Sequence, residues 1–438
     1  MIVEIAKRAK AAAGAMARLS AEEKNHALTG IARSLDERRE EILAANRKDL
    51  DAARAQVESG KMAESLYSRL KLDDSKLDAI LSGIEQIARM EDPVGRVTLA
   101  TELDEGLRLY RVTCPVGVVG VIFESRPDAL VQIASLCLKS GNAVLLKGGR
   151  EAEKSNRALF RIIHASAAER GLPGDAMALL ERREDVMALL DAESFVDLIV
   201  PRGSNSLVRF IQENTRIPVL GHAEGICHIY IDRAADLTKA VEIILDAKVS
   251  YPAACNAVET LLIHSRVAPD FLPRVAEALK KCKVELRCDP RSIELVEGAK
   301  EATEVDWATE YCDLILSIKV VDSLEEAIAH INLYGSHHTD AIITEDDEAW
   351  EKFFVEVDSA GVYRNASTRF ADGYRYGFGA ELGISTGKLH PRGPVGLDGL
   401  VTYKYKLTGR GHTAAMYSKG GRRFTHKNVQ STDFSRQA

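Results

Sequence analysis

One cysteine stands where the chain could place a nucleophile. Cys255 lies in the segment SYPAACN (250–256), which ends a predicted helix and leads into an apolar run that begins at Val258. A thiol on a tight turn between two rigid elements suits covalent catalysis. A lone cysteine is more often an inert core residue, and no histidine lies near it in sequence as an obvious base. Cys255 is therefore a candidate nucleophile, and the alternative is that it is an inert core residue.

Two junctions between an apolar strand and a helix could bind phosphate. The first carries Lys147-Gly-Gly-Arg150, and the second carries Gly203-Ser204 after an apolar strand. Helix N-termini with free N–H groups attract phosphate. The chain has no Gly-x-Gly-x-x-Gly, so a dinucleotide would be held by another device than the Rossmann fingerprint. Because glycine and serine are common at helix starts, ordinary loops remain the alternative.

An arginine follows the apolar strand 118–123. Arg126 precedes Pro127, which is suited to the first position of a helix. Its guanidinium could grip a carboxylate or a phosphate with two hydrogen bonds. The alternative is a surface salt bridge with Glu124 or Asp128.

Histidine, cysteine and glutamate elsewhere form no clear site. The pairs Cys227-His228 and His337-His338 lack the spacing of metal ligands, so no metal is expected. Glu381, in the segment GFGAE, is typical of a turn residue. The seven cysteines are odd in number, scattered and without a Cys-x-x-Cys pair, which indicates neither a disulfide framework nor a zinc site.

Hydrophobic periodicity predicts the elements that must position these residues. Residues 1–90 have helical spacing, and 98–116 alternate as two antiparallel strands joined at 104–106. Beyond Pro115 buried strands alternate with helices in two successive runs, which indicates two parallel α/β domains. Strands are expected at 118–123, 143–146, 196–200, 229–231, 258–263, 314–320 and 341–344, and helices begin near 127, 151, 204, 237, 269 and 324.

Composition limits the class of protein. At 438 residues and 46% hydrophobic, the chain has room for two or three domains with ordinary cores. The net charge of -7 with mixed signs gives no basic stripe for nucleic acid. The N-terminus is charged, and the longest uncharged stretch, 112–123, is too short to span a bilayer. We therefore expect a cytoplasmic protein that acts on small molecules, without membrane or nucleic-acid partners.

Several long motifs in one order identify a family resemblance. They resemble the gamma-glutamyl phosphate reductase family of the aldehyde dehydrogenase superfamily, and the resemblance as a whole covers about residues 1–412. The motifs are CPVGVVGVIFESRP (114–127), KGGREA (147–152), YPAACNAVET (251–260), YGSHHTD (334–340), NASTRFADG (365–373) and GISTGKLHPRGPVG (383–396).

The resemblance implies a role for each candidate at the cofactor. It makes Cys255 the catalytic nucleophile. It places the ribose and phosphates of a nicotinamide cofactor at Lys147, Gly203 and Ser204, and the nicotinamide ribose at Glu310. Because Lys147 and Arg150 flank two glycines at a helix start, two cations could meet a 2′-phosphate there. We therefore expect NADP(H) to be preferred over NAD(H).

The implied reaction is the NADPH-dependent reduction of L-glutamyl 5-phosphate to L-glutamate 5-semialdehyde and phosphate, a step of proline biosynthesis. The nucleophile would attack the acyl phosphate, phosphate would leave, and the thioester would accept hydride without a metal. Such a substrate carries an acyl phosphate at one end and an α-carboxylate at the other. We expect Arg126 at the phosphate and Arg369, beside Ser367 and Thr368, at the carboxylate.

The resemblance also implies the domain plan. Residues 1–101 and 116–227 would bind the cofactor, and 228–398 would form the catalytic domain. Residues 102–115 and 399–412 would form a strand flap that bridges subunits, so we expect a homo-oligomer. The polar tail 413–438 is expected to be disordered or to clasp a neighbouring subunit. A glutamate 5-kinase is a candidate partner that would supply the acyl phosphate.

Two departures from aldehyde-oxidising relatives bear on the reaction. Arg126 stands where they have an asparagine that binds the substrate oxygen. Gly221 or His222 stands where they have a glutamate that activates water, although Glu224 is close by. Hydrolysis of the thioester is therefore in doubt. The alternatives are an NAD-dependent aldehyde dehydrogenase that oxidises a semialdehyde, and a binding or structural protein that has lost catalysis.

Overall fold

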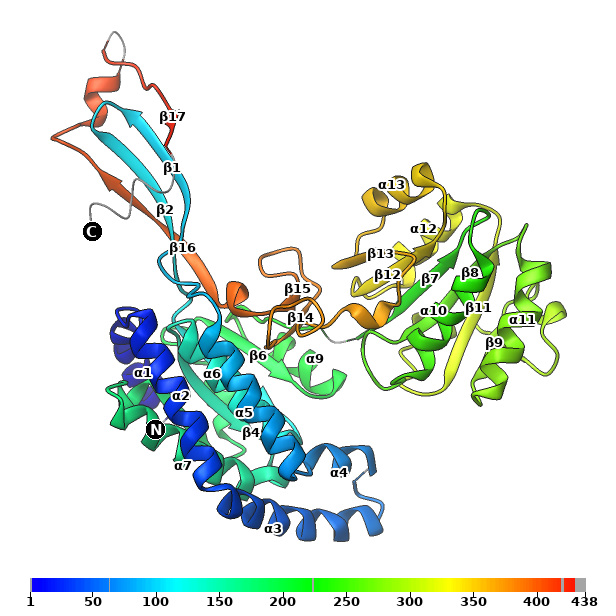
Figure 1. Ribbon diagram of the computed structural model, residues 1–438, viewed down its shortest axis with the longest axis horizontal. Coiled ribbons are helices and arrows are strands. Elements are labelled where there is room, and N and C mark those ends of the chain that lie inside the picture. The colour runs from blue at the N-terminus through cyan, green and yellow to red at the C-terminus, as the bar shows by residue number, and fades with distance from the viewer. Residues whose placement is uncertain (1, 63, 223, 419–420, 430–438) are drawn as a thin grey trace.

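The computed structural model describes residues 2–62, 64–222, 224–418 and 421–429. They form two α/β domains and a narrow antiparallel sheet that projects away from both (Figure 1). This confirms the predicted fold class. No helix among the described residues is long and apolar enough to cross a membrane.

The first domain begins with the predicted helical layer. Its helices are α1 (Ile2–Met16), α2 (Ala21–Glu37), α3 (Arg39–Glu58), α4 (Glu64–Leu70) and α5 (Asp74–Arg89). A capping box begins α2, where Ser20 accepts the N–H of Glu23 and the Glu23 side chain accepts that of Ser20. Apolar faces of α1, α2 and α5 join one buried cluster with the neighbouring sheet.

The sheet of this domain places the phosphate-binding candidates along one edge. It is parallel, in the order β5-β4-β3-β6. The loops after β3, β4 and β6 carry the segments 124–126, 149–150 and 203–204, so they meet at the carboxyl end of the sheet. Its elements are β3 (Val118–Phe123), α6 (Pro127–Lys139), β4 (Ala143–Gly148), α7 (Glu153–Glu169), β5 (Met177–Leu180), α8 (Asp185–Leu190), β6 (Leu198–Arg202) and α9 (Asn205–Glu213). Sequence analysis did not predict β5 or α8.

The second domain holds a seven-stranded parallel sheet in the order β10-β9-β11-β8-β7-β12-β13. Its elements are β7 (Cys227–Ile231), α10 (Leu237–Val249), β8 (Val258–His264), α11 (Ala268–Lys281), β9 (Glu285–Cys288), β10 (Lys300–Glu301), β11 (Ile315–Val321), α12 (Leu324–Tyr334), β12 (Thr339–Ile343), α13 (Asp347–Glu356) and β13 (Gly361–Arg364). The predicted strands and helices of this run are present. The short strands β9, β10 and β13 and the helix α13 were not predicted, because their apolar runs are brief.

The chain returns to the first domain earlier than predicted. Residues 380–398, which include the hairpin β14 (Gly383–Ser385) and β15 (Gly393–Val395), were assigned to the catalytic domain, and Leu400 was assigned to the flap. Leu382, Val395 and Leu400 instead pack in the buried cluster of the first domain. These residues therefore belong to the first domain, because their apolar side chains are buried in its core.

The projecting sheet is longer than the predicted flap. It consists of β16 (Val401–Thr408), β2 (Leu107–Pro115), β1 (Val97–Asp104) and β17 (Lys427–Asn428), in that order. The turn between β1 and β2 requires Gly106, whose φ is +74°. The flap begins at Val97 rather than at 102, and β17 in the tail pairs with β1 in the same chain. Residues 430–438 of the tail lie outside the described residues.

Candidate active site

A cavity of about 1060 Å³ is lined by residues of both α/β domains. The first domain contributes the loops after β3, β4 and β6, and the second contributes the turn before β8 and the segment 369–372. Cys255, Arg126, Arg369, Gly203, Ser204 and Glu310 all lie on its wall. The structure therefore brings most of the predicted site residues to one cavity.

Cys255 lies on the turn between α10 and β8, as predicted. Backbone hydrogen bonds from Ala254 to Tyr251 and from Ala257 to Ala254 close this turn. Asn256 fixes it to the next segment by donating to the carbonyl of Ala371 at 2.9 Å. The chain at Gly225 passes so close that a Cβ there would lie 2.1 Å from the carbonyl oxygen of Cys255. The half-buried thiol is thus held on a backbone that is fixed from both sides.

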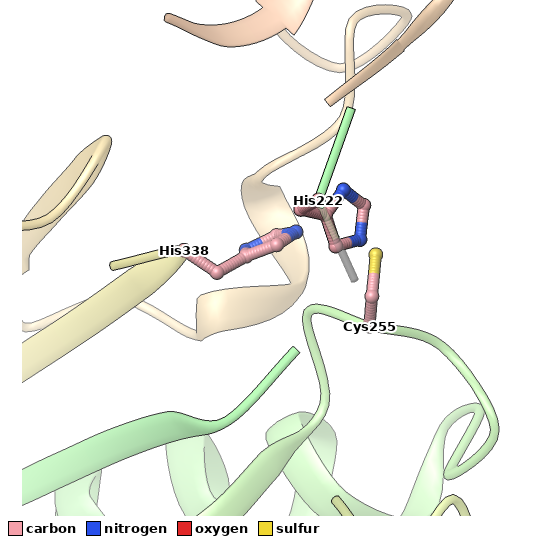
Figure 2. Close-up of side chains that lie close together, drawn as sticks. All are labelled: His222, Cys255 and His338. Carbon is pink, nitrogen blue, oxygen red and sulfur yellow. The ribbon is translucent and has the colours of Figure 1, made fainter. Parts of the chain in front are cut away.

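His222 is the histidine that the neighbouring sequence of Cys255 lacks. Its Nδ1 bonds to the carbonyl of Ile384 at 2.9 Å, so this nitrogen carries the proton and Nε2 has a free lone pair. Figure 2 shows a ring nitrogen of His222 directed at the sulfur of Cys255. Burial lowers the pKa of His222, and the charge of Arg202 lowers it further. His222 can therefore act as a neutral base beside the thiol.

A second histidine lies behind this pair. The rings of His338 and His222 meet edge to face with centroids 4.9 Å apart. A nitrogen of each ring and the sulfur of Cys255 lie within 4.8 Å of one another. The Nδ1 of His338 lies 2.9 Å from the hydroxyl of Thr339, whereas its buried Nε2 has no hydrogen-bond partner among the described residues.

Two arginines from the first domain face the cavity together. Arg126 begins α6 and forms a salt bridge of 3.2 Å with Asp128, as its alternative interpretation proposed. Arg202 ends β6, and its guanidinium has no hydrogen bond or ion pair with any described residue. Burial lowers the pKa of Arg202, and the charge of Arg126 lowers it further. Two neighbouring cations, one of them unpaired, form a site for an anion.

The second domain contributes the third arginine. Arg369 donates from Nε to the hydroxyl of Ser250 at 3.2 Å and lies over the ring of Tyr251. Burial and the charge of Arg375 lower its pKa. Ser367 and Thr368 do not line the cavity. Ser367 is buried and caps the next helical turn by accepting the N–H of Arg369.

The proposed phosphate site at the start of α9 holds a carboxylate. Ser204 donates its backbone N–H to Glu124 at 2.8 Å. A Cβ at Gly203 would lie 2.3 Å from the same Glu124 oxygen, so the glycine makes room for the anion. Asn205 donates to Glu310 at 2.8 Å across the cavity. This helix start thus binds an anion with a backbone donor, which is the chemistry that a pyrophosphate needs.

The other proposed phosphate site is more enclosed. Lys147 is buried, its pKa is lowered by burial, and its Nζ donates to the carbonyl of Gly148 at 2.7 Å. Lys147 does not line the cavity. Arg150 is exposed. A second glutamate, Glu151, lies over Gly149, where a Cβ would come within 2.1 Å of its Oε1.

Sequence analysis considered two acidic residues, Glu224 and Glu381. Each of them is already paired with another group. Glu224 forms an ion pair with Arg209 and does not line the cavity. Glu381, interpreted as a turn residue, does line it and accepts the N–H of Gly373 at 2.8 Å. Of the two residues considered at 221–222, His222 is the one whose side chain lies beside the thiol.

The chain matches known proteins over nearly its whole length. The family model "Aldehyde dehydrogenase family" matches residues 1–294. A gamma-glutamyl phosphate reductase from Cyanothece sp. (strain PCC 7425) is 57% identical over 98% of this chain and 98% of its own. One from Pelotomaculum thermopropionicum is 55% identical over 97% of each chain.

A solved structure agrees with these matches. The crystal structure of gamma-glutamyl phosphate reductase from Thermotoga maritima has a TM-score of 0.91 and 43% identity, and it covers 94% of this chain and 99% of its own. The predicted family and the aldehyde dehydrogenase fold are both confirmed. With its cysteine on the cavity wall and its sequence matched from end to end, the chain belongs to the gamma-glutamyl phosphate reductase family of the aldehyde dehydrogenases, a family of oxidoreductases.

Proposed function

We propose that the protein reduces L-glutamyl 5-phosphate to L-glutamate 5-semialdehyde and phosphate with NADPH, through a thioester on Cys255, in proline biosynthesis. The observation that carries the proposal is the position of Cys255 beside His222 in the cavity that Arg126 and Arg202 also line. A nucleophile, a base and an anion site are the groups that acyl transfer from a phosphate requires.

The first half of the reaction forms the thioester. His222 accepts the thiol proton at Nε2, and the sulfur of Cys255 forms a bond to the acyl carbon. The bond between that carbon and the phosphate oxygen then breaks, and phosphate leaves with the electron pair. Arg202 and Arg126 stabilise the phosphate charge, since guanidinium groups bind phosphate in a bidentate manner.

The second half releases the aldehyde. A nicotinamide cofactor held at Gly203, Ser204 and Glu310 would supply the hydride that reduces the thioester. His222 returns its proton to the sulfur of Cys255 as the carbon–sulfur bond breaks, which frees the aldehyde and restores the thiol. The balance is one acyl phosphate, one NADPH and one proton consumed, with one aldehyde, one NADP⁺ and one phosphate formed.

The residues at the start of α9 fit a dinucleotide. Aldehyde dehydrogenase family enzymes use NAD(P). Gly203 leaves room for an anion and Ser204 offers a backbone donor, while Glu310 lies on the same wall for a ribose hydroxyl. We propose that Arg150, which is exposed, supplies more of the preference for NADP(H) than Lys147, which is buried against Gly148. Affinities for NADPH and for NADH, measured in variants that neutralise Lys147, Arg150 or both, would separate the contributions of the two residues.

We propose that Arg369 binds the end of the substrate that lies opposite the acyl phosphate. Its guanidinium lies on the cavity wall, and a partly buried cation of this kind suits the α-carboxylate. Ser367 acts here by fixing the backbone of Arg369 rather than by contact, since it caps the turn. Thr368 is buried and does not line the cavity, so no direct contact is proposed for it.

We also propose a homo-oligomer in the cytoplasm. β16 is an edge strand of the projecting sheet, and Tyr403, Tyr405 and Leu407 are exposed on it. An exposed apolar edge strand is a template for a second chain. Light scattering of the protein, and of a variant with lysine at Tyr405, tests this assembly.

The deciding experiment is an assay in the oxidising direction. With glutamate semialdehyde and NADP⁺, we expect NADPH to form only when phosphate is present. Glu224 is paired with Arg209, and the cavity carboxylates Glu310 and Glu381 are already hydrogen-bonded, so water has no free carboxylate base. Cys255→Ala should abolish turnover and leave folding intact. Brisk turnover without phosphate that yields free glutamate would show an aldehyde-oxidising dehydrogenase instead.

A further inference from the structure

We propose that Cys255, His222 and His338 form an inhibitory binding site for a thiophilic divalent cation of the Zn²⁺ type. One ligand atom from each residue lies within 4.8 Å of the other two. Figure 2 shows the three side chains converging from separate segments, with the sulfur of Cys255 beside His222 and the ring of His338 behind it. Thiolate and imidazole are the ligands that zinc prefers.

The spacing of the three atoms is close to that of a bound ion. With zinc–sulfur and zinc–nitrogen distances of about 2.3 Å and 2.0 Å, tetrahedral ligand atoms lie about 3.3–3.7 Å apart. The observed limit of 4.8 Å therefore requires a contraction of about 1 Å, which small rotations of the three side chains can supply. A fourth position faces the cavity, where water can complete the tetrahedron.

Both histidines are oriented as metal ligands are. A ligating histidine usually donates its other ring N–H to a carbonyl, carboxylate or hydroxyl, which fixes the free lone pair toward the ion. His222 bonds through Nδ1 to the carbonyl of Ile384 at 2.9 Å, and His338 through Nδ1 to the hydroxyl of Thr339 at 2.9 Å. In each ring this leaves Nε2 as the atom that can bind a metal.

The second observation is the unused nitrogen of His338. The residue is fully buried, and its Nε2 has no hydrogen-bond partner among the described residues. A buried polar atom without a partner is costly, and a metal would satisfy it.

The charges around the site set the expected strength of binding. Zinc would displace the thiol proton, so the cation and the thiolate leave a net charge of +1 on the complex. Arg202 lines the same cavity as Cys255 and opposes this charge, whereas Glu310 and Glu381 on the same wall favour it. We therefore expect reversible binding that a chelator removes, rather than the retention of a structural zinc ion.

Occupation of this site would stop catalysis by removing the nucleophile and its base together. That consequence depends on the proposed role of Cys255, whereas the binding itself does not. Binding and inhibition are therefore measured separately, so that failure of one can be told from failure of the other.

The binding experiment uses the full chain and its single variants. His338→Asn keeps an amide where Nδ1 bonds to Thr339 but removes Nε2. The matched control is His337→Asn, since His337 is the adjacent histidine, lies outside the site and has a φ of +60°, which asparagine tolerates. Co²⁺ absorption and competition with a zinc-sensitive dye report ligand type and stoichiometry. Cys255→Ser provides a second variant should His338→Asn fold poorly.

We expect one metal ion per chain, a thiolate-to-cobalt absorption band, and affinity at least about tenfold lower in His338→Asn, the loss that even outer-shell substitutions cause. His337→Asn should bind as the parent does. Zinc should also slow alkylation of Cys255, followed by mass spectrometry, and EDTA should reverse this effect. Unchanged zinc affinity in both His338→Asn and Cys255→Ser would overturn the site. Zinc bound at the three residues without loss of turnover would overturn the inhibitory role and, with it, the proposed role of Cys255.

Discussion

Glu124 and Ser204 are joined by a hydrogen bond of 2.8 Å from the backbone N–H at the start of α9 to the carboxylate at the end of β3. This carboxylate occupies the donor that we assign to the cofactor pyrophosphate. Glu124 must therefore move before that group can bind, and its negative charge would oppose the approach of phosphate.

Replacing Glu124 with glutamine should strengthen NADPH binding. The amide loses the charge-assisted bond to Ser204, and a neutral hydrogen bond is weaker by about 1 kcal/mol, so the dissociation constant should fall about fivefold. Quenching of protein fluorescence on titration with NADPH measures this change. Glu213→Gln, at the other end of α9, is the matched control and should leave the affinity unchanged. Weaker binding in Glu124→Gln would mean that the carboxylate contacts the cofactor favourably.

Arg202→Met should lower activity without lowering stability. The guanidinium is partly buried with no described partner, so its loss removes no ion pair and relieves repulsion with Arg126. Because Arg202 would bind the leaving phosphate, kcat/KM should fall at least about 100-fold. Thermal unfolding and steady-state kinetics test the two halves together. A clear fall in the melting temperature would show that Arg202 holds the fold instead.

Sequence and structure agree where local pattern decides the outcome. The strand β3 occupies 118–123 as predicted because six apolar residues in a row suit a strand buried on both faces. The turn at Cys255 was predicted because Pro252 follows a helical pattern and Val258 begins an apolar run. Both features depend only on neighbours in the chain.

The parts that sequence missed depend on distant contacts. His222, Cys255 and His338 are 33 and 83 residues apart in sequence, so no motif spacing could reveal that their side chains meet. Arg202 carried no signal beyond its place before Gly203, because only the fold shows that its guanidinium is unpaired. The packing of Leu382 in the core of the first domain was missed for the same reason, because a short apolar run does not indicate which sheet it packs against.

The pH dependence of turnover should report His222. Burial and Arg202 lower the pKa of this histidine below its usual 6.5, so the ring is neutral at that pH and can accept the thiol proton. We therefore expect the acidic limb of kcat/KM to lie below pH 6.5. By the same shift, the unfolded chain binds the extra proton first, so stability is lost as the pH falls from 6.5 toward the folded pKa.

His222→Asn is the matched test of that assignment. Asparagine can still donate to the carbonyl of Ile384 but offers no base at Nε2. Alkylation of Cys255 by iodoacetamide at neutral pH should slow by about 100-fold, the lower end of the usual effect of a removed general base. Equal rates in the two proteins would show that another group activates the thiol.

The last prediction concerns hydrolysis of the thioester and again uses substitutions of His222. Glu224 is held by Arg209, and the cavity carboxylates Glu310 and Glu381 accept hydrogen bonds from Asn205 and Gly373, so none of the three is a free base for water and phosphate opens the thioester instead. His222→Glu would put a carboxylate beside Cys255. We expect this variant to form NADPH from glutamate semialdehyde and NADP⁺ without phosphate, at a low rate, and to release glutamate. His222→Gln, which has the same shape without the basicity, is the control and should need phosphate as the parent does. Quantifying glutamate at the end of each reaction decides the matter. If His222→Glu still requires phosphate and yields no glutamate, exclusion of water from the cavity, rather than the missing carboxylate, explains why the thioester is not hydrolysed.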